Sequence, residues 1–377
     1  MTGSDSLKQL PLKGLPLKDL PLKDLHERAG AKFAPFAGWD MPVSYPLGVL
    51  KEHLHCRAHA GLFDISHMRL FEVSGADAAG LIATLCPVEA AEQAVGASKY
   101  TFLLNENAGV IDDLIVTRLA EDRFIIVANA ARAATDEAWI RDHAAGRDAA
   151  IEALDRVFLA LQGPDAAAVM DDNTIDISGL SFMSGFEPRP GWFVTRSGYT
   201  GEDGFEIALP LDRASAFAES LARDERVEWI GLAARDSLRL EAGLCLYGND
   251  LDEETDPVSA GLLWAIPKDL RGGGPYVGAK RLADIVAAGP AQKRVGLQAE
   301  GRQPVRAGAD LTDPDGNPAG RVTSGGFGPS VEHPVAMGYV PVELAKPDTQ
   351  LFADVRGKPV GMSVVKLPFI AKRSQKG

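Results

Sequence analysis

The C-terminal third of this 377-residue chain consists of short strand-like runs, and this pattern restricts the fold more than any other feature. Such runs follow one another at positions 294–298, 309–312, 318–323, 335–339, 350–355 and 358–364. Glycine, proline and Asp-Gly turns separate them, so no long helix fits here. The pattern predicts a small all-β barrel or sandwich. Because the flexible sequence Arg271-Gly272-Gly273-Gly274-Pro275 precedes it, we expect this domain at residues 275–377.

The N-terminal two-thirds alternates short strand-like runs with single helices and hairpin-like connections. This mixture favours an α+β fold over a doubly wound parallel sheet. We expect a first α+β region at residues 21–150 and a second at residues 151–274. One local prediction is that Ser74 caps a helix over Ala76–Leu85.

The first 25 residues contain a repeat of five residues with the pattern Pro-Leu-Lys-Asp-Leu. A proline in each unit prevents a continuous helix, and a period of five matches neither helix nor strand. We therefore expect residues 1–20 to form a mobile N-terminal tail.

Composition excludes several classes of function. With 39 basic and 52 acidic residues the net charge is -13, which argues against nucleic-acid binding. No window approaches 18 consecutive apolar residues, and the N-terminus has no secretory h-region, so we expect no membrane association. The three cysteines show no Cys-x-x-Cys spacing, which predicts free thiols in a reducing compartment. Because no targeting signal is visible, we expect a cytoplasmic protein.

The familiar catalytic templates are absent from the sequence. It contains no dinucleotide-binding fingerprint, P-loop, HExxH or GxSxG motif. His55 and His59 are four residues apart and would share a helix face, as zinc ligands do. No second ligand cluster completes a tetrahedral site, so we expect no metal and a structural role for these histidines.

Three other segments offer candidate site residues. Asp112 and Asp113 open an apolar strand and should point to opposite faces of a sheet, so they are not a proton-sharing pair. The glycine-rich turn at 197–206 carries acids able to accept hydrogen bonds from an amino-substituted heterocycle. Arg235 and Arg239 are four apart on one face of a predicted helix, where they either hold a ligand's acceptors or form surface ion pairs.

Taken together, these segments resemble one family, the T-protein of the glycine cleavage system, a tetrahydrofolate-dependent aminomethyltransferase. The resemblance runs from about Pro21 to Phe369. The matching strings are Gly30-Ala31-Lys32, Phe36-Ala37-Gly38-Trp39-Asp40-Met41-Pro42, Ala60-Gly61-Leu62-Phe63-Asp64-Ile65-Ser66-His67-Met68, Gly109-Val110-Ile111-Asp112-Asp113-Leu114-Ile115, Gly198-Tyr199-Thr200-Gly201-Glu202-Asp203-Gly204-Phe205-Glu206, Ala234-Arg235-Asp236-Ser237-Leu238-Arg239-Leu240-Glu241-Ala242-Gly243, Leu246-Tyr247-Gly248-Asn249-Asp250 and Val322-Thr323-Ser324-Gly325-Gly326.

The resemblance implies a three-lobed fold with two α+β lobes, a C-terminal β-barrel and tetrahydrofolate in a central channel. It implies transfer of the methylene group of an aminomethyl-lipoyl carrier, the H-protein, to tetrahydrofolate. By resemblance Asp112 matches the essential aspartate, and Glu206 and Arg235 match residues that grip the pterin. The other residues implied in or near the pocket are Tyr100, Asn129, Tyr199, Met68 and Arg239. Lys372 and Arg373 are candidates to meet the folate's carboxylates.

The sequence departs from the family in two places. Ala108-Gly109 stands where the family usually has two glycines, and the family has no counterpart for the N-terminal repeat. Two other functions stay open at this point. One is a folate-dependent demethylase on the same scaffold, and the other is a non-catalytic folate-binding assembly factor, whose Lys-Gly-Cys signature is absent here.

Overall fold

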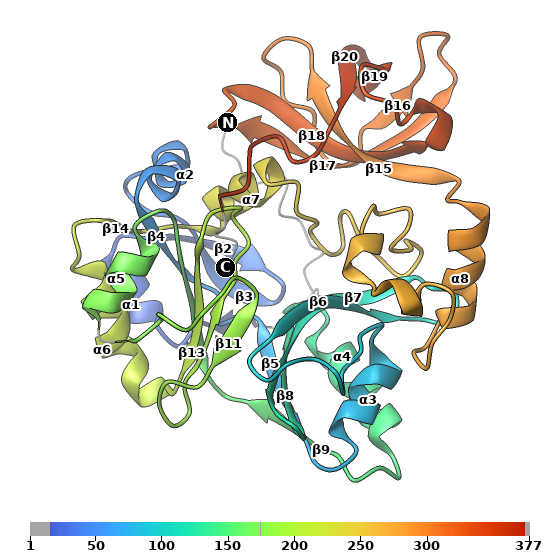
Figure 1. Cartoon of the computed structure of the whole chain (residues 1–377). Coiled ribbons are helices and arrows are strands. Elements are labelled where there is room, and N and C mark those ends of the chain that lie inside the picture. The colour runs from blue at the N-terminus through green and yellow to red at the C-terminus, as the bar shows by residue number, and fades with distance from the viewer. Residues whose placement is uncertain (1–15, 174, 374–377) are drawn as a thin grey trace. The chain divides into compact units, whose positions relative to one another are not determined.

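The computed structural model describes residues 16–173 and 175–373, and it divides into two compact units (Figure 1). The barrel unit contains residues 102–112 and 236–372, and the sheet unit contains residues 16–101, 113–235 and 373. Both units take segments from distant parts of the sequence. The predicted consecutive regions 21–150 and 151–274 therefore contribute strands to shared sheets, as described below.

The barrel unit contains a closed six-stranded barrel with the order β15-β18-β17-β16-β19-β20 (Figure 1). Every pairing in it is antiparallel, and β15 pairs with β20 to close the ring. The strands are β15 (Gln292–Ala299), β16 (Asp310–Thr312), β17 (Pro318–Gly328), β18 (His333–Pro341), β19 (Gln350–Val355) and β20 (Lys358–Val365). Alternate residues of each strand fill the interior, among them Leu297, Val322 and Leu351. The predicted C-terminal barrel is confirmed.

The same unit includes helix α8 (Ala279–Ala288) and the short 3-10 helices η2 (Leu263–Ala265), η3 (Lys268–Leu270) and η4 (Val342–Leu344). Helix α8 begins after Gly278, whose φ of 79° is in the left-handed region. A side chain there would also collide with the carbonyl oxygen of Asn105, at 2.4 Å from an added Cβ. Glycine at 278 is therefore required by both conformation and space.

The sheet unit is centred on a six-stranded sheet with the order β11-β12-β13-β10-β4-β14. Its strands are β4 (Ala60–Asp64), β10 (Val157–Gln162), β11 (Ser184–Phe186), β12 (Phe193–Arg196), β13 (Gly204–Leu209) and β14 (Val227–Trp229). Strand β4 comes from the first predicted region and the other strands from the second. The boundary expected near residue 150 therefore does not separate two sheets.

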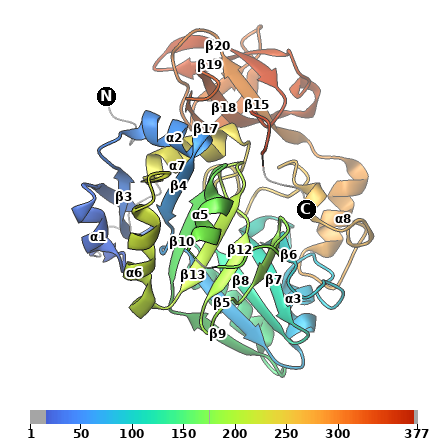
Figure 2. The ribbon, with the colours of Figure 1, turned by 60° about the vertical axis from the view of Figure 1, so that its left-hand side comes forward.

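Helices cover one face of this sheet, which we call the core face (Figure 2). They are α1 (Lys23–Arg28), α5 (Ala166–Asp172) and α6 (Leu211–Ala222). The core face takes every second residue of a strand, such as Leu159 and Leu161 of β10 and Phe205 and Ile207 of β13. Residues between them point to the opposite face, because side chains alternate along a strand.

A five-stranded sheet has the order β6-β7-β8-β5-β9 and carries helices α3 and α4 (Figure 1). Its elements are β5 (Arg69–Ser74), β6 (Ser98–Leu104), β7 (Val110–Ala120), β8 (Arg123–Ala128), β9 (Ala150–Leu154), α3 (Ala78–Leu85) and α4 (Ala133–Ala144). A third, small sheet pairs β1 (Lys18–Asp19) with β3 (Trp39–Ser44), and β3 with β2 (Lys32–Phe36). The remaining helices are α2 (Val49–Ala58) and α7 (Leu232–Glu241). The mixed α+β architecture is as expected.

Two local predictions need correction. Ser74 does not cap α3: that helix begins at Ala78 with Asp77 as its N-cap residue, because Gly75 turns the chain first. The expected tail also ends earlier than residue 20, since Lys18–Asp19 form β1 and Leu20 is buried. Most of that tail, residues 1–15, lies outside the described residues. Among the helices described, none has the length and apolar character needed to cross a membrane.

Candidate functional site

Glu206 lies on the face of the six-stranded sheet opposite the core face. In the register, Ala160 of β10 pairs with both Glu206 and Phe63, and Thr195 pairs with Glu206 from the other side. These four residues therefore form one row across the sheet. Ser197 donates a hydrogen bond of 2.8 Å to Glu206 Oε2. Burial raises the pKa of Glu206, while the bond from Ser197 and the charge of Arg235 partly oppose this rise.

The turn at 197–204 is held by buried polar side chains beneath it. Gln162 Nε2 donates to the carbonyl oxygen of Ser197 at 2.9 Å, and its Oε1 accepts from Thr200 Oγ1 at 2.9 Å. Arg57 donates to the carbonyl oxygen of Thr200 at 2.7 Å and pairs with Glu202 at 2.9 Å. Because both ends of the turn are tied to buried groups, its one ring, Tyr199, has a defined position.

Arg235, near the start of α7, is the cation of this cluster. Its guanidinium lies 4.8 Å from the centre of the Tyr199 ring and 6.0 Å from that of Phe63. It is 9% exposed, and among the described residues its Nη1 has no hydrogen-bond partner. Burial lowers the pKa of Arg235, against the opposing charges of Glu206 and Tyr199. A buried donor without an acceptor is costly, so this atom is suited to a ligand that supplies one.

The loop after β4 brings His67 and Met68 into the same unit. His67 is buried, with an edge-to-face contact of 5.7 Å to the ring of Phe36. Burial, and then the charge of Arg235, lower the pKa of His67 to about 3, so the imidazole is neutral at physiological pH. Met68 is half-buried. A single histidine carries no spacing signal, so the sequence does not distinguish His67 as a ligand-binding residue.

The two neighbouring aspartates of β7 are in different environments. Tyr100 donates to Asp113 Oδ2 at 2.8 Å, and Asn129 Nδ2 donates to Asp113 Oδ1 at 2.9 Å. Tyr100 and Asn129, both expected in the pocket, therefore meet at Asp113. Asp112 is fully buried on the strand face that also carries Leu114. Asp113 thus shares contacts with two other residues predicted for the pocket, and which of the two carboxylates meets a ligand stays a prediction.

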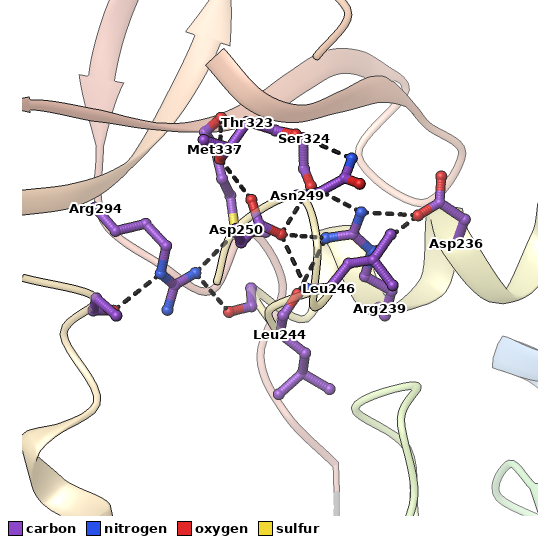
Figure 3. Close-up of polar contacts among 12 residues, drawn as sticks. Asp236, Arg239, Leu244, Leu246, Asn249, Asp250, Arg294, Thr323, Ser324 and Met337 are labelled. Atoms are coloured by element: carbon purple, nitrogen blue, oxygen red, sulfur yellow. Dashed lines mark hydrogen bonds and ion pairs between the residues drawn. The ribbon is translucent and has the colours of Figure 1, made fainter. Parts of the chain in front are cut away.

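Arg239 belongs to a buried network in the barrel unit (Figure 3). It donates to Asp250 at 2.9 Å and to Ser324 Oγ at 2.8 Å, and it pairs with Asp236 at 2.8 Å. Asp250 also accepts from Ser324 at 2.7 Å and from Thr323 at 2.5 Å. These bonds connect the end of α7 to strand β17. They support a structural role, and contact between Arg239 and folate stays a prediction.

The C-terminal candidates also have defined surroundings. The backbone N–H of Arg373 donates to the carbonyl oxygen of Gly201 at 2.8 Å, and its side chain lies 3.9 Å from Glu202. These contacts fasten the end of the described chain to the Tyr199 turn. Burial lowers the pKa of Lys372.

His55 on α2 and His59, the residue that follows this helix, both have protein partners. His55 Nε2 lies 3.0 Å from the carbonyl oxygen of Arg226, and His59 Nδ1 lies 3.0 Å from Asp165. Within residues 16–173 and 175–373, no group of three or more His, Cys, Asp or Glu side chains is arranged to hold a metal ion.

Two family models match the chain. The GCVT N-terminal domain matches residues 22–270, and the glycine cleavage T-protein C-terminal barrel domain matches residues 292–370. Together they include the sheets that carry Glu206 and Asp113, helix α7 with Arg235, and the whole barrel.

Proteins of known identity match over nearly the full length. The mitochondrial aminomethyltransferase of Gallus gallus is 44% identical over 376 residues, covering 97% of this chain and 93% of the relative. That of Homo sapiens is 41% identical over 355 residues, covering 92% and 88%. The crystal structure of the glycine cleavage system aminomethyltransferase T from Bartonella henselae is 58% identical, with a TM-score of 0.94, covering 96% of this chain and 100% of that one.

Proposed function

This chain belongs to the glycine cleavage T-protein family and is an aminomethyltransferase of the glycine cleavage system, and we propose how its residues perform that reaction. The substrates we propose are tetrahydrofolate and the aminomethyl group on the lipoyl arm of an H-protein carrier. The products are 5,10-methylenetetrahydrofolate, ammonia and the dihydrolipoyl carrier. The demethylase and the non-catalytic assembly factor are not favoured, because the named relatives are aminomethyltransferases.

The observation that carries the ligand assignment is that Glu206 and Arg235 are both buried, that the charge of each acts on the other, and that Arg235 lies over the Tyr199 ring. A pterin presents amino and ring N–H donors along one edge and acceptor atoms elsewhere. Glu206 accepts from the donor edge. Arg235 Nη1, a buried donor without a partner among the described residues, donates to the ring's acceptor atoms. The Tyr199 ring adds an aromatic surface for stacking.

We propose Asp113 as the carboxylate at the reacting centre. Its two oxygens are held by Tyr100 and Asn129, so its orientation is set before substrate arrives. When the C–N bond of the aminomethyl group breaks and ammonia leaves, positive charge develops on the methylene group. A fixed carboxylate stabilises that charge while the folate N5 attacks. N10 then closes the ring as the C–S bond to the lipoyl arm breaks, and the two folate N–H protons leave with the ammonia and the dihydrolipoyl thiol.

The partners and the compartment are also proposals. We propose the H-protein as the carrier that this chain binds. The three buried cysteines, which form no disulfide within the described residues, agree with a reducing, cytoplasmic setting. Cell fractionation of the source organism tests the compartment.

A carrier-coupled assay tests the function. Purified protein is mixed with aminomethylated H-protein and tetrahydrofolate, and ammonia release and methylenetetrahydrofolate formation are followed together. Equal amounts of both products support the proposal. Ammonia without the folate product, or turnover of a small methylated amine in place of the carrier, contradicts it.

A further inference from the structure

Three buried polar side chains form a hydrogen-bonded chain on the core face of the sheet unit. His26 Nε2 lies 2.8 Å from Asp64 Oδ2, and His26 Nδ1 lies 2.9 Å from the hydroxyl of Tyr45. One arrangement of protons satisfies both contacts: Nε2–H donates to the carboxylate, and the tyrosine hydroxyl donates to Nδ1. Burial, followed by the charges of Asp64 and Glu52, raises the pKa of Tyr45, which keeps this hydroxyl protonated.

Trp229 packs against two of these three hydrogen-bonded side chains, His26 and Tyr45. Its ring lies 4.9 Å from that of His26, edge to face, and is stacked at 6.0 Å on that of Tyr45. The side chains of His26 and Asp64 are both 0% exposed. Since water does not reach the pair, its geometry is set by protein groups alone, and losing one member leaves the other unsatisfied.

The second carboxylate oxygen of Asp64 holds the loop that follows β4 through a hydrogen bond. Asp64 Oδ1 accepts from the backbone N–H of Ser66 at 2.9 Å. Ser66 Oγ in turn accepts from the N–H of Phe158 at 3.0 Å, and the N–H of Met68 donates to the carbonyl oxygen of Ile65 at 2.9 Å. The loop is therefore tied to Asp64 at one end and closed as a turn at the other.

This loop presents His67 with an unused hydrogen-bonding atom. His67 is 8% exposed, and in the part of the chain that the structure describes its Nδ1 has no partner. The charge of Arg235 acts on the same imidazole, and Arg235 Nη1 is also without a partner there. Buried polar atoms without a hydrogen-bond partner are rare, so both atoms are suited to a ligand that completes them.

We infer that His67 is a specificity-determining residue that hydrogen-bonds the folate ring through Nδ1, and that Tyr45, His26 and Asp64 are positioning residues that hold it in place. This inference rests on the proposed folate function. A neutral imidazole donates or accepts one directed hydrogen bond without adding charge beside Arg235. It therefore recognises the polar pattern of the ring's edge, whereas Arg235 attracts acceptor atoms in general.

The direct test measures tetrahydrofolate binding by anaerobic calorimetry for the full chain and for His67→Phe and His67→Asn. We expect about tenfold weaker binding for His67→Phe, the loss expected for one hydrogen bond to a buried polar group. His67→Asn, which keeps a polar atom near Nδ1, should recover most of the affinity. The matched control is His143→Phe, because His143 lies on α4 and bonds the carbonyl oxygen of Trp139. It should bind folate as the unchanged chain does.

Wild-type affinity in His67→Phe overturns the inference, and so does equal loss in the phenylalanine and asparagine variants. If the unchanged chain fails to bind tetrahydrofolate, the proposed function is at fault instead. Circular dichroism establishes that each variant is folded at the temperature of the titration.

The positioning role is tested with Asp64→Asn and Asp64→Ala. Asparagine keeps an acceptor for the N–H of Ser66. Its amide can donate to His26 Nε2, and His26 Nδ1–H then donates to the Tyr45 hydroxyl, so both hydrogen bonds persist with their direction reversed. We therefore expect a KM for tetrahydrofolate within about threefold of the original. Alanine removes both contacts and should raise this KM about tenfold while kcat changes less. If both variants lose thermal stability but keep the original KM, or if they raise KM equally, the positioning role is refuted. If His67→Phe fails to fold, the comparison of Asp64→Asn with Asp64→Ala still tests whether the position of His67 affects folate binding.

Discussion

The hydroxyl of Tyr100 donates a hydrogen bond of 2.8 Å to the carboxylate of Asp113, the second of two adjacent aspartates in strand β7. The amide of Asn129 holds the other carboxylate oxygen. Resemblance alone selected the first aspartate, Asp112, which is fully buried on the other face of the strand. The two assignments make opposite predictions for two otherwise equivalent substitutions.

We expect Asp113→Asn to lower the rate of carrier-coupled methylene transfer by about 10²–10³-fold, because it removes a fixed negative charge beside the developing cation. Asp112→Asn serves as the matched variant, with a smaller effect on rate at saturating folate. Single-turnover kinetics with both substrates saturating separate the chemical step from binding. A large loss in Asp112→Asn together with normal turnover in Asp113→Asn would return the role to Asp112.

Arg235→Lys should weaken tetrahydrofolate binding at least about tenfold, although the charge is kept. Lysine has a compact ammonium group and lacks the planar fork that stacks on Tyr199 and presents Nη1 to a ligand. Calorimetry measures the affinity, and an unchanged dissociation constant would remove Arg235 from the pterin site. A surface control is Arg213→Lys on α6, whose side chain is 72% exposed.

Glu206→Gln should stabilise the folate-free protein at neutral pH. The pKa of Glu206 is raised in the folded state, mainly by burial, so the folded protein binds this proton more tightly than the unfolded chain. Stability therefore falls as pH rises from the unfolded pKa through the folded one. Melting temperatures of both proteins should agree near pH 4 and separate above it, with the variant higher. A variant less stable at pH 7 would mean that the bond from Ser197 outweighs the cost of burial.

His67 should make the protein sensitive to acid. Because its pKa is lowered to about 3 in the folded state, protonation favours the unfolded chain, and stability is lost as pH falls from about 6.5 toward 3. His67→Phe should reduce this loss relative to the unchanged protein. Denaturant titrations at pH 7 and pH 5 measure it, and identical pH dependence in both proteins would contradict the prediction.

Asp250→Ala should be strongly destabilising, by about 3–5 kcal/mol, because it removes the fully buried one of the two carboxylates that pair with the Arg239 guanidinium. Asp310→Ala is a matched control in the same unit, since its pair with Arg321 is exposed and should have little effect. The free energy of unfolding from denaturant titration measures both. Similar losses in the two variants would show that the network in Figure 3 is not a stabilising one.

Local pattern accounts for most of the secondary structure. The strands of the barrel were predicted within a few residues, because short apolar runs between Gly and Pro turns have few alternatives. The predicted cap at Ser74 was wrong because Gly75 turns the chain before α3 begins at Ala78. Caps depend on the exact path of a connection, which periodicity does not describe.

The order of residues along the chain determined which strands and helices form, that the fold is α+β with a C-terminal barrel, and to which family the chain belongs. Only the tertiary structure decided which side chains meet. The pairing of β4 with β10 places Phe63 in a row with Glu206, and the surroundings of β7 distinguish Asp113 from Asp112. The unsatisfied atoms of His67 and Arg235 also become visible only there. The physical reason is that periodicity reflects local backbone geometry, whereas burial and hydrogen-bond partners depend on segments far apart in the sequence.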